Sequence, residues 1–93
     1  MTNDTMPPIT LYSCDSSQIH AHGYDPDGEI LALQFKRSVT VDGEKKRVAG
    51  SLYYYENFTR DDYQEFLQSK SKGEYFGAVI KPNAERWPYR QIS

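Results

Sequence analysis

β-Forming apolar residues alternate with polar ones from residue 19 to residue 56, and two turn signals divide this segment. Asp25-Pro26-Asp27-Gly28 combines a proline that presets φ with a glycine suited to the left-handed position of a bulged loop. Asp42-Gly43 is the preferred pair for a two-residue type I′ turn. The pattern predicts three antiparallel strands, one starting at residue 19 and two more over residues 29–41 and 44–56.

Counting outward from these turns predicts which side chains share a face, because opposed residues of an antiparallel pair lie on the same side. Leu33 then opposes Leu52 across one pair and Ala21 across the other. The register predicts a core face that contains Ile19, Ala21, Leu31, Leu33, Phe35, Gly50, Leu52 and Tyr54. It also predicts a polar, aromatic face that contains His20, His22, Tyr24, Ile30, Ala32, Gln34, Ser51, Tyr53 and Tyr55.

A helix is expected after residue 57. Thr59 is a good N-cap, and Asp61 and Asp62 complement the positive end of the helix dipole. Apolar residues recur at helical spacing, and Gly73 is the expected stop. A shorter helix is expected over residues 75–80, followed by an extended segment, residues 87–92, that is available as a fourth, edge strand.

These elements predict an α+β domain: an antiparallel meander of about three strands packed against one main helix and a short second helix. Residues 1–15 are polar and predict an N-terminal arm, and residues 16–93 predict a single domain with an extended hairpin at residues 39–48. The chain has one cysteine, Cys14, which excludes an internal disulfide. Because it shows neither a signal pattern nor an apolar run of ~20 residues, we expect a cytoplasmic protein.

Charge is unevenly distributed along the chain, although the net charge is only -2. This net charge argues against a partner as anionic as duplex DNA. Residues 1–35 contain five acidic residues and no lysine or arginine, whereas residues 70–93 contain five basic residues and two acidic ones. This polarity can steer a charged partner without identifying it.

Four short motifs are spread over the chain: Ser16-Ser17-Gln18-Ile19, Gly23-Tyr24-Asp25, Gly50 with the Tyr-x-Tyr pair Tyr53 and Tyr55, and Ser71-Lys72-Gly73-Glu74-Tyr75-Phe76. Together they resemble the KTSC domain over about residues 16 to 92. That family occurs as small free-standing bacterial or phage proteins and as a C-terminal extension of some lysyl-tRNA synthetases, where RNA binding has been suggested. Two features depart from it: the central hairpin is extended, and His22 stands where the family usually has an apolar residue.

We therefore expect a non-enzymatic module that binds RNA or another single-stranded nucleic acid. Tyr24, Tyr53 and Tyr55 are the candidates for stacking on bases. The candidates for holding phosphates are Lys70, Lys72, Arg86 and Arg90. The alternative for the aromatic face is that it forms a second small core, covered by Tyr75, Phe76, Trp87 and Tyr89.

The alternative function is a protein-interaction module, one version of which is encoded by a phage and binds a host protein. Its candidate contacts are Lys45, Lys46 and Arg47 on the extended hairpin. A charged hairpin end can also serve only for solubility and edge protection.

No residue pattern indicates catalysis, and no cofactor is expected. His20 and His22 supply at most half of a zinc site, because zinc requires three or four ligands. Ser16-Ser17 lacks the context of an activated nucleophile. Cys14 has no basic neighbour in the sequence that would favour its thiolate.

Overall fold

Each strand of the protein pairs with the next one along the chain in a computed structural model that describes residues 8–14 and 16–93. The antiparallel sheet has the order β1-β2-β3-β4-β5. Its strands are β1 (Tyr12–Ser13), β2 (Ile19–Asp25), β3 (Ile30–Val41), β4 (Glu44–Tyr55) and β5 (Tyr89–Gln91). The expected α+β class is confirmed, but about three strands is too few: β5 supplies the C-terminal edge, and β1 adds an edge strand that the sequence pattern did not predict.

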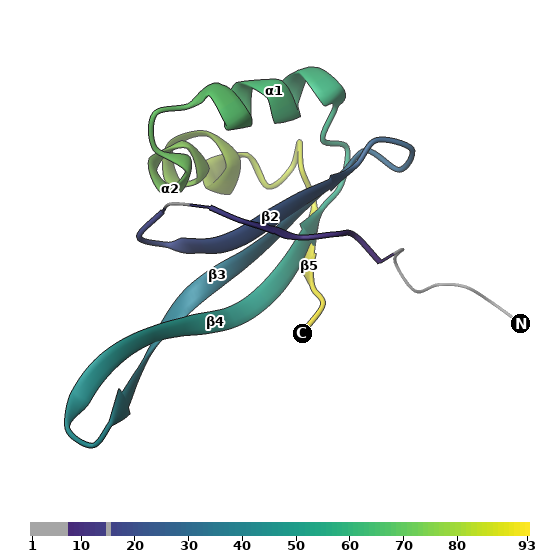
Figure 1. Cartoon of the computed structure of the whole chain (residues 1–93). Helices are drawn as coiled ribbons and strands as arrows, with labels where there is room; N and C mark the ends of the chain where they lie inside the picture. Colours follow the sequence, from purple (N-terminus) through teal and green to yellow (C-terminus); the bar gives the residue numbers. More distant parts are fainter. Residues whose placement is uncertain (1–7, 15) are drawn as a thin grey trace, which may run out of the picture.

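Two helices, α1 (Arg60–Gln68) and α2 (Lys72–Tyr75), lie over one face of the sheet (Figure 1). Thr59 caps α1 as expected: its Oγ1 accepts from the Asp62 N–H at 3.1 Å, and the Asp62 carboxylate accepts from the Thr59 N–H at 3.0 Å. This reciprocal pair is a capping box.

The expected helix stop at Gly73 is wrong. The first helix ends at Gln68, and Ser71 caps α2 by accepting from the Glu74 N–H at 3.2 Å. Gly73 is buried inside α2 against Ser16 and Gln18. The expected helix at 75–80 is the middle of a longer helical run, in which a π-helical turn (Phe76–Ile80) and a 3₁₀ turn (Lys81–Asn83) follow α2.

A β-bulge in β4 and a longer first turn shift the expected register. Asp42 and Gly43, with φ of 53° and 81°, form the expected type I′ turn, and pairing runs regularly from Val41↔Glu44 to Lys36↔Ala49. The next pair is Gln34↔Leu52, so Gly50 and Ser51 together face Phe35. In the first hairpin Asp25 pairs with Ile30, so residues 26–29 form the loop and the pairs from Ala21 to Asp25 are offset by one residue from the expected ones; a bulge at His20 then returns Ile19 to its expected partner Phe35.

Each offset of one residue exchanges the two faces of a strand, because side chains alternate with period two. The expected pairs Leu33–Leu52 and Leu33–Ala21 are therefore wrong, and Leu33 instead faces Tyr53 and His22. Phe35 faces Ile19 as expected. The residues that move onto the core face are His22, Tyr24, Tyr53 and Tyr55, and those that move to the opposite face are Ala21, Leu52 and Tyr54.

The main core lies between the sheet and the helices. Its fully buried members are Ile19, Leu31, Leu33, Phe58, Phe66 and Ile80, together with the nearly buried Tyr55 and Trp87. A smaller cluster on the opposite face joins Ile30, Ala32 and Tyr54 to Ile9 and Leu11. A Cβ on Gly23 would lie 2.2 Å from the Thr10 carbonyl oxygen, so this close approach of the N-terminal segment requires glycine.

The first hairpin turn also differs from the prediction in one detail. Glu29, with φ of 54°, takes the left-handed conformation expected at Gly28. The Asp25 carboxylate accepts from the Asp27 N–H at 3.1 Å, as expected for an aspartate that initiates a turn.

Candidate nucleic-acid interface

A groove of about 410 Å³ opens where the helical layer meets the sheet and β5. It is lined by Phe35, Lys36, Arg37, Ser51, Tyr53, Tyr55, Phe76, Lys81 and Tyr89. Five of these residues are aromatic and three are cationic. None of the nine carries a carboxylate.

The aromatic rings of the groove form one continuous surface. Phe35 lies 4.9 Å from Phe76 and 5.8 Å from Tyr53, measured between ring centroids. Tyr89 lies 5.9 Å from Tyr53 and 5.5 Å from Tyr55. Tyr89 is 55% exposed, so its ring is available to a ligand, whereas Tyr55 is buried beneath.

Tyr55 adds no negative charge to the groove. Burial raises the pKa of Tyr55 well above its ordinary value of 10, and the neighbouring Tyr53 and Tyr89 act in the same direction. Its hydroxyl therefore stays protonated at neutral pH.

The three cations of the groove are not neutralised by carboxylates. The ion pairs among the described residues are Arg86–Asp62 and Arg90–Glu56, and neither involves Lys36, Arg37 or Lys81. The Lys36 Nζ donates to the Ser16 carbonyl oxygen at 2.5 Å, which fixes the side chain without cancelling its charge. The groove can thus accept a ligand that combines flat rings with negative charge.

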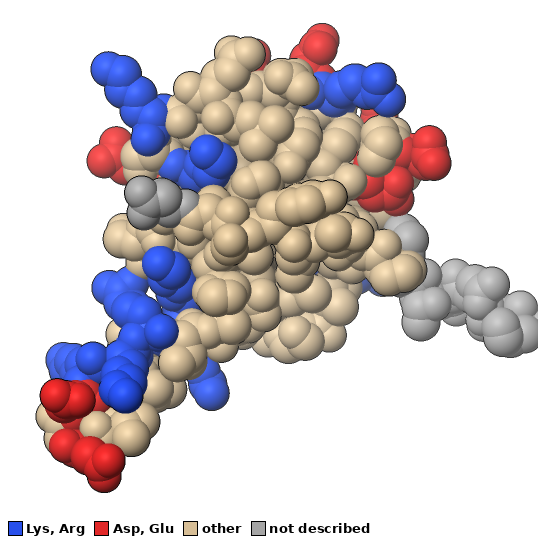
Figure 2. Space-filling model, viewed as in Figure 1, with Lys and Arg blue, Asp and Glu red and all other residues tan. Residues whose placement is uncertain are grey.

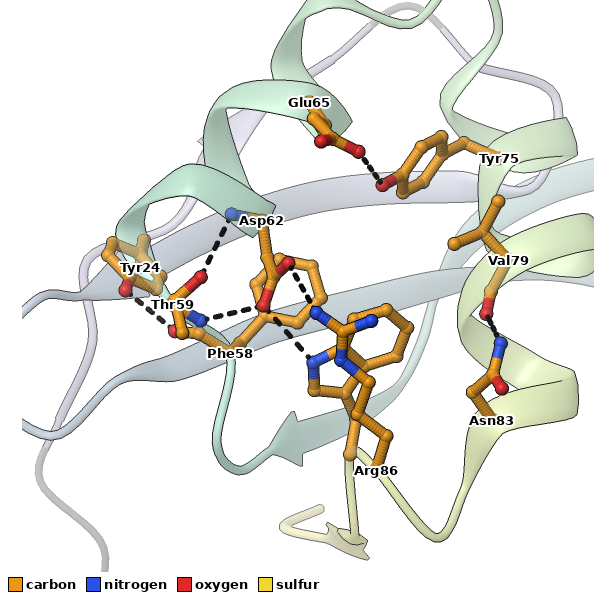
Figure 3. A network of polar contacts seen from close by, with 10 residues as sticks. Tyr24, Phe58, Thr59, Asp62, Glu65, Tyr75, Val79, Asn83 and Arg86 are labelled. Carbon is orange, nitrogen blue, oxygen red and sulfur yellow. Dashed lines mark hydrogen bonds and ion pairs between the residues drawn. The ribbon is translucent and has the colours of Figure 1, made fainter.

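Only two of the residues expected to bind nucleic acid, Tyr53 and Tyr55, line this groove. Tyr24 does not line the groove: it lies near the C-terminal end of β2, where its ring stacks on Tyr63 with centroids 4.5 Å apart. Its hydroxyl donates to the Phe58 carbonyl oxygen at 2.6 Å (Figure 3). The expectation that the three tyrosines share a face opposite the core is wrong, because the offset at the first turn places Tyr24, and the bulge in β4 places Tyr53 and Tyr55, on the core face. The alternative is borne out in part: Phe76 and Tyr89 lie against Tyr55, as expected of a cover, but Tyr55 and Trp87 belong to the main core rather than to a second one.

The four expected phosphate contacts also lie outside the groove lining. Lys70 is exposed just beyond α1, and Lys72 is half-buried at the start of α2. The Arg90 guanidinium lies 3.4 Å from the Glu56 carboxylate. Arg86 pairs with Asp62 at 3.1 Å and lies over the Trp87 ring, 4.5 Å from its centroid.

Asp62 organises the contact between α1 and the C-terminal segment (Figure 3). Besides the Thr59 N–H, its carboxylate accepts from the Arg86 guanidinium at 3.1 Å and the Trp87 indole N–H at 3.4 Å. These bonds and the buried Trp87 ring fix the C-terminal segment in place. Tyr89 on this segment therefore lies in the groove. Sequence reasoning identified Asp62 only as a helix-dipole residue.

The histidines are separated by the bulge at His20. His22 is buried, its Nδ1 lies 3.0 Å from the Tyr63 hydroxyl, and its ring contacts Phe66 edge-on. Burial, with the nearby Lys72 charge, lowers the pKa of His22 below its ordinary value of 6.5. Among residues 8–14 and 16–93, no group of three His, Cys, Asp or Glu side chains is placed to hold a metal ion.

The remaining polar candidates make local contacts. The Ser16 Oγ accepts from the Ile19 N–H at 3.1 Å, and the Cys14 Sγ lies 3.4 Å from the Ile19 carbonyl oxygen. In the described part of the chain, no helix is long and apolar enough to cross a membrane.

The comparisons with known proteins agree on one family. A family model described as the KTSC domain matches residues 15–83. The chain belongs to the KTSC domain family. It is 28% identical to a KTSC domain protein from Yersinia pestis, whose crystal structure aligns with a TM-score of 0.67 over 92% of this chain and 100% of the other.

Two sequence relatives of the KTSC chain cover most of its length. An uncharacterized protein of Stutzerimonas stutzeri is 32% identical over 72 residues, which are 77% of this chain and 84% of the relative. A protein of Tsukamurella paurometabola is 31% identical over 68 residues, 73% of this chain and 84% of the relative. None of these names states a ligand.

Sequence reasoning missed most of the groove. Phe35 was expected in the core, and Phe76 and Tyr89 were expected only as a possible cover of the aromatic face. Lys36, Arg37 and Lys81 were not singled out. The signal that could have found the groove is Gly50, because glycine inside a strand often marks a bulge. A bulge there turns Tyr53 and Tyr55 toward Phe35.

Proposed function

We propose that the KTSC chain is a binding module whose aromatic groove binds single-stranded nucleic acid, with RNA as the leading candidate ligand. The observation that carries this proposal is the row of contacting rings beside Lys36, Arg37 and Lys81. Proteins that bind single strands combine such stacking surfaces with cations that follow the backbone. The groove is lined by no histidine, cysteine or carboxylate, so its chemistry suits binding rather than catalysis.

The arrangement implies a measurable dependence on salt. Three cations that each neutralise one phosphate of a single strand give a slope of log affinity against log salt of about -2. Stacking on Tyr89 adds about 1 to 3 kcal/mol per base. Because every base has a flat face, we expect little sequence preference.

The test compares two exposed tyrosines. Tyr89→Ala removes a ring of the groove, and Tyr12→Ala removes a ring that is 62% exposed on β1 and does not line the groove. Binding of a 12-nucleotide RNA and of the matching DNA single strand is measured by fluorescence anisotropy at several salt concentrations. We expect Tyr89→Ala to weaken binding at least fivefold, the effect of about 1 kcal/mol, and Tyr12→Ala to leave it unchanged.

Two results would count against this function. One is the absence of binding by the unaltered chain at low salt, where electrostatic attraction is strongest. The other is an equal loss in Tyr89→Ala and Tyr12→Ala, which would show that the groove has no special part in binding.

A second candidate function is protein interaction through the β3–β4 hairpin. The observation that favours it is that the hairpin projects from the body of the domain, with Lys45, Lys46 and Arg47 exposed (Figure 1). Removing residues 39–48 should then abolish capture of a protein partner while the domain stays folded. Retained capture would exclude this version.

A further inference from the structure

The outer part of the β3–β4 hairpin contributes little to the core. From Arg37 to Gly50 its two strands pair only with each other in the part of the chain that the structure describes. Most of these side chains are exposed, including every one from Val41 to Arg47. A long two-stranded ribbon of this kind is marginal on its own, so burial of apolar surface does not account for its length.

The register sorts the hairpin into two chemically different faces. The pairs Ser38↔Arg47 and Thr40↔Lys45, with Lys36 two residues before Ser38, lie on one side. This donor face consists of Lys36, Ser38, Thr40, Lys45 and Arg47, and it contains no carboxylate. The opposite face carries Arg37, Val39, Val41, Glu44, Lys46 and Val48, so three valines and an acid accompany its cations.

The donor face retains its positive charge. Arg47 donates to the Ser17 carbonyl oxygen and Lys36 to that of Ser16. Carbonyl groups orient these side chains but do not neutralise them, and each side chain keeps further N–H donors. Figure 2 shows the basic side chains gathered along the hairpin, with acidic side chains at its tip.

The chemistry of the donor face matches a phosphate backbone. Lysine, arginine, serine and threonine are residues that contact phosphates, and the hairpin has no aromatic residue on which a base could stack. From Lys36 to Thr40 the face extends over about 13 Å, at about 3.3 Å per residue. This length corresponds to about four base-pair steps of about 3.4 Å. A duplex holds its phosphates at such regular spacing, whereas a single strand does not.

Lys36 lies where the donor face meets the groove, because it is part of the groove lining and begins the donor face, although the donor face lies on the other side of β3 from the ring of Phe35. We propose that the donor face binds the backbone of a nucleic-acid duplex, so that the preferred ligand carries a single-stranded segment next to a duplex. The joint ligand rests on the proposed function of the groove. The net charge of -2 argued against a duplex partner, but the donor face itself is positively charged, and affinity for a duplex depends on the charge at the contact.

The experiment compares two neighbouring lysines. Lys45→Gln and Lys46→Gln remove the same charge from the same exposed strand, but only Lys45 lies on the donor face. Each variant is titrated with a 12-nucleotide single strand, a blunt 12-base-pair duplex, and that duplex with the single strand as an overhang, in RNA and DNA forms. Thermal unfolding of both variants checks that the domain remains folded.

We expect the unaltered chain to bind the overhang ligand more tightly than the single strand alone. Lys45→Gln should weaken binding of the duplex and overhang ligands about five- to tenfold at 0.1 M salt, and lower the salt slope by about 0.9, the share of one phosphate contact. The affinity of Lys45→Gln for the single strand should not change. On a logarithmic scale, Lys46→Gln should lose less than half as much duplex affinity as Lys45→Gln. The RNA and DNA arms show which backbone fits.

Several outcomes would overturn the proposal. Equal losses in the two variants would mean that only overall charge matters, and equal affinity for overhang and single strand would mean that the duplex makes no contact. Capture of an acidic protein by the hairpin, with no duplex binding, would replace it with the second candidate function. A failure of the proposed groove function alone can be distinguished from a failure of this proposal. In that case Tyr89→Ala would not change single-strand binding, whereas Lys45→Gln would still weaken binding of the blunt duplex.

Discussion

Asp62 is the single residue on which the position of the C-terminal segment depends most. Its carboxylate caps α1 and also accepts from Arg86 and Trp87. Asp62→Ala should lower the free energy of unfolding by about 1 to 3 kcal/mol, because it breaks the capping box and leaves the buried Trp87 indole N–H without its acceptor, whereas the Arg86 side chain is 63% exposed and can bond to water. Asp61→Ala, an exposed acid in the same helical turn, should cost less than about 1 kcal/mol.

Urea unfolding of both aspartate variants, followed by tryptophan fluorescence of Trp87, makes this comparison. Equal destabilisation by the two substitutions would show that the helix dipole, rather than the hydrogen-bond network, accounts for the contribution of Asp62.

His22 should make the stability of the domain depend on pH. Burial and Lys72 lower its pKa in the folded chain below the ordinary 6.5. As pH falls below 6.5, the unfolded chain therefore takes up the proton first. Stability should be full above pH 6.5 and should decrease as pH falls below that value.

The measurement is the unfolding free energy between pH 7.5 and 5.5 for the unaltered chain and for two variants. His22→Leu should flatten the dependence of the unfolding free energy on pH in this range, while His20→Gln should leave this dependence unchanged. An unchanged slope in His22→Leu would assign the pH dependence to another group.

At the scale of the elements, the bulge in β4 depends on Gly50. A Cβ at this position would lie 2.9 Å from the Phe35 carbonyl oxygen, so Gly50→Ala should destabilise the domain by about 1 to 3 kcal/mol. Gly77, in the π-helical turn, has no atom within 4 Å of the same position. Gly77→Ala should therefore stabilise by about 0.5 to 1 kcal/mol. Denaturant unfolding of the two variants checks the opposite signs; a shift in the same direction would contradict this account.

The same bulge shows how far the sequence predicts this fold. Local chemistry predicted the Asp42-Gly43 turn, the Thr59 cap and the C-terminal edge strand, because each depends on a few neighbouring residues. Register depends on every residue between the turn and the point of interest, so one undetected bulge exchanged the faces beyond Lys36. The groove could not be predicted from a pattern that placed Tyr53 and Phe35 on opposite faces.

On the scale of the whole molecule, stability and proposed recognition are assigned to different parts. The core, the Asp62 network and both bulges lie in the body of the domain, while the outer hairpin is exposed and strongly charged. Such a division allows surface charge to change without loss of folding, since exposed substitutions usually alter stability by less than about 0.5 kcal/mol. The groove lies at the junction of the two parts, where Lys36 and Arg37 belong to both.

A shortened hairpin tests this division directly. Removing Thr40, Val41, Glu44 and Lys45 deletes two cross-strand pairs, keeps the Asp42-Gly43 turn, and leaves the net charge at -2 because one acid and one base are lost together. The facing of the remaining side chains is preserved, because two residues are removed from each strand. We expect the free energy of unfolding to change by less than about 0.5 kcal/mol, while affinity for the overhang ligand falls about five- to tenfold, as in Lys45→Gln, because Lys36, Ser38 and Arg47 remain on the donor face. A loss of more than about 2 kcal/mol would show that the outer hairpin stabilises the body, and unchanged overhang affinity would place the duplex contact elsewhere.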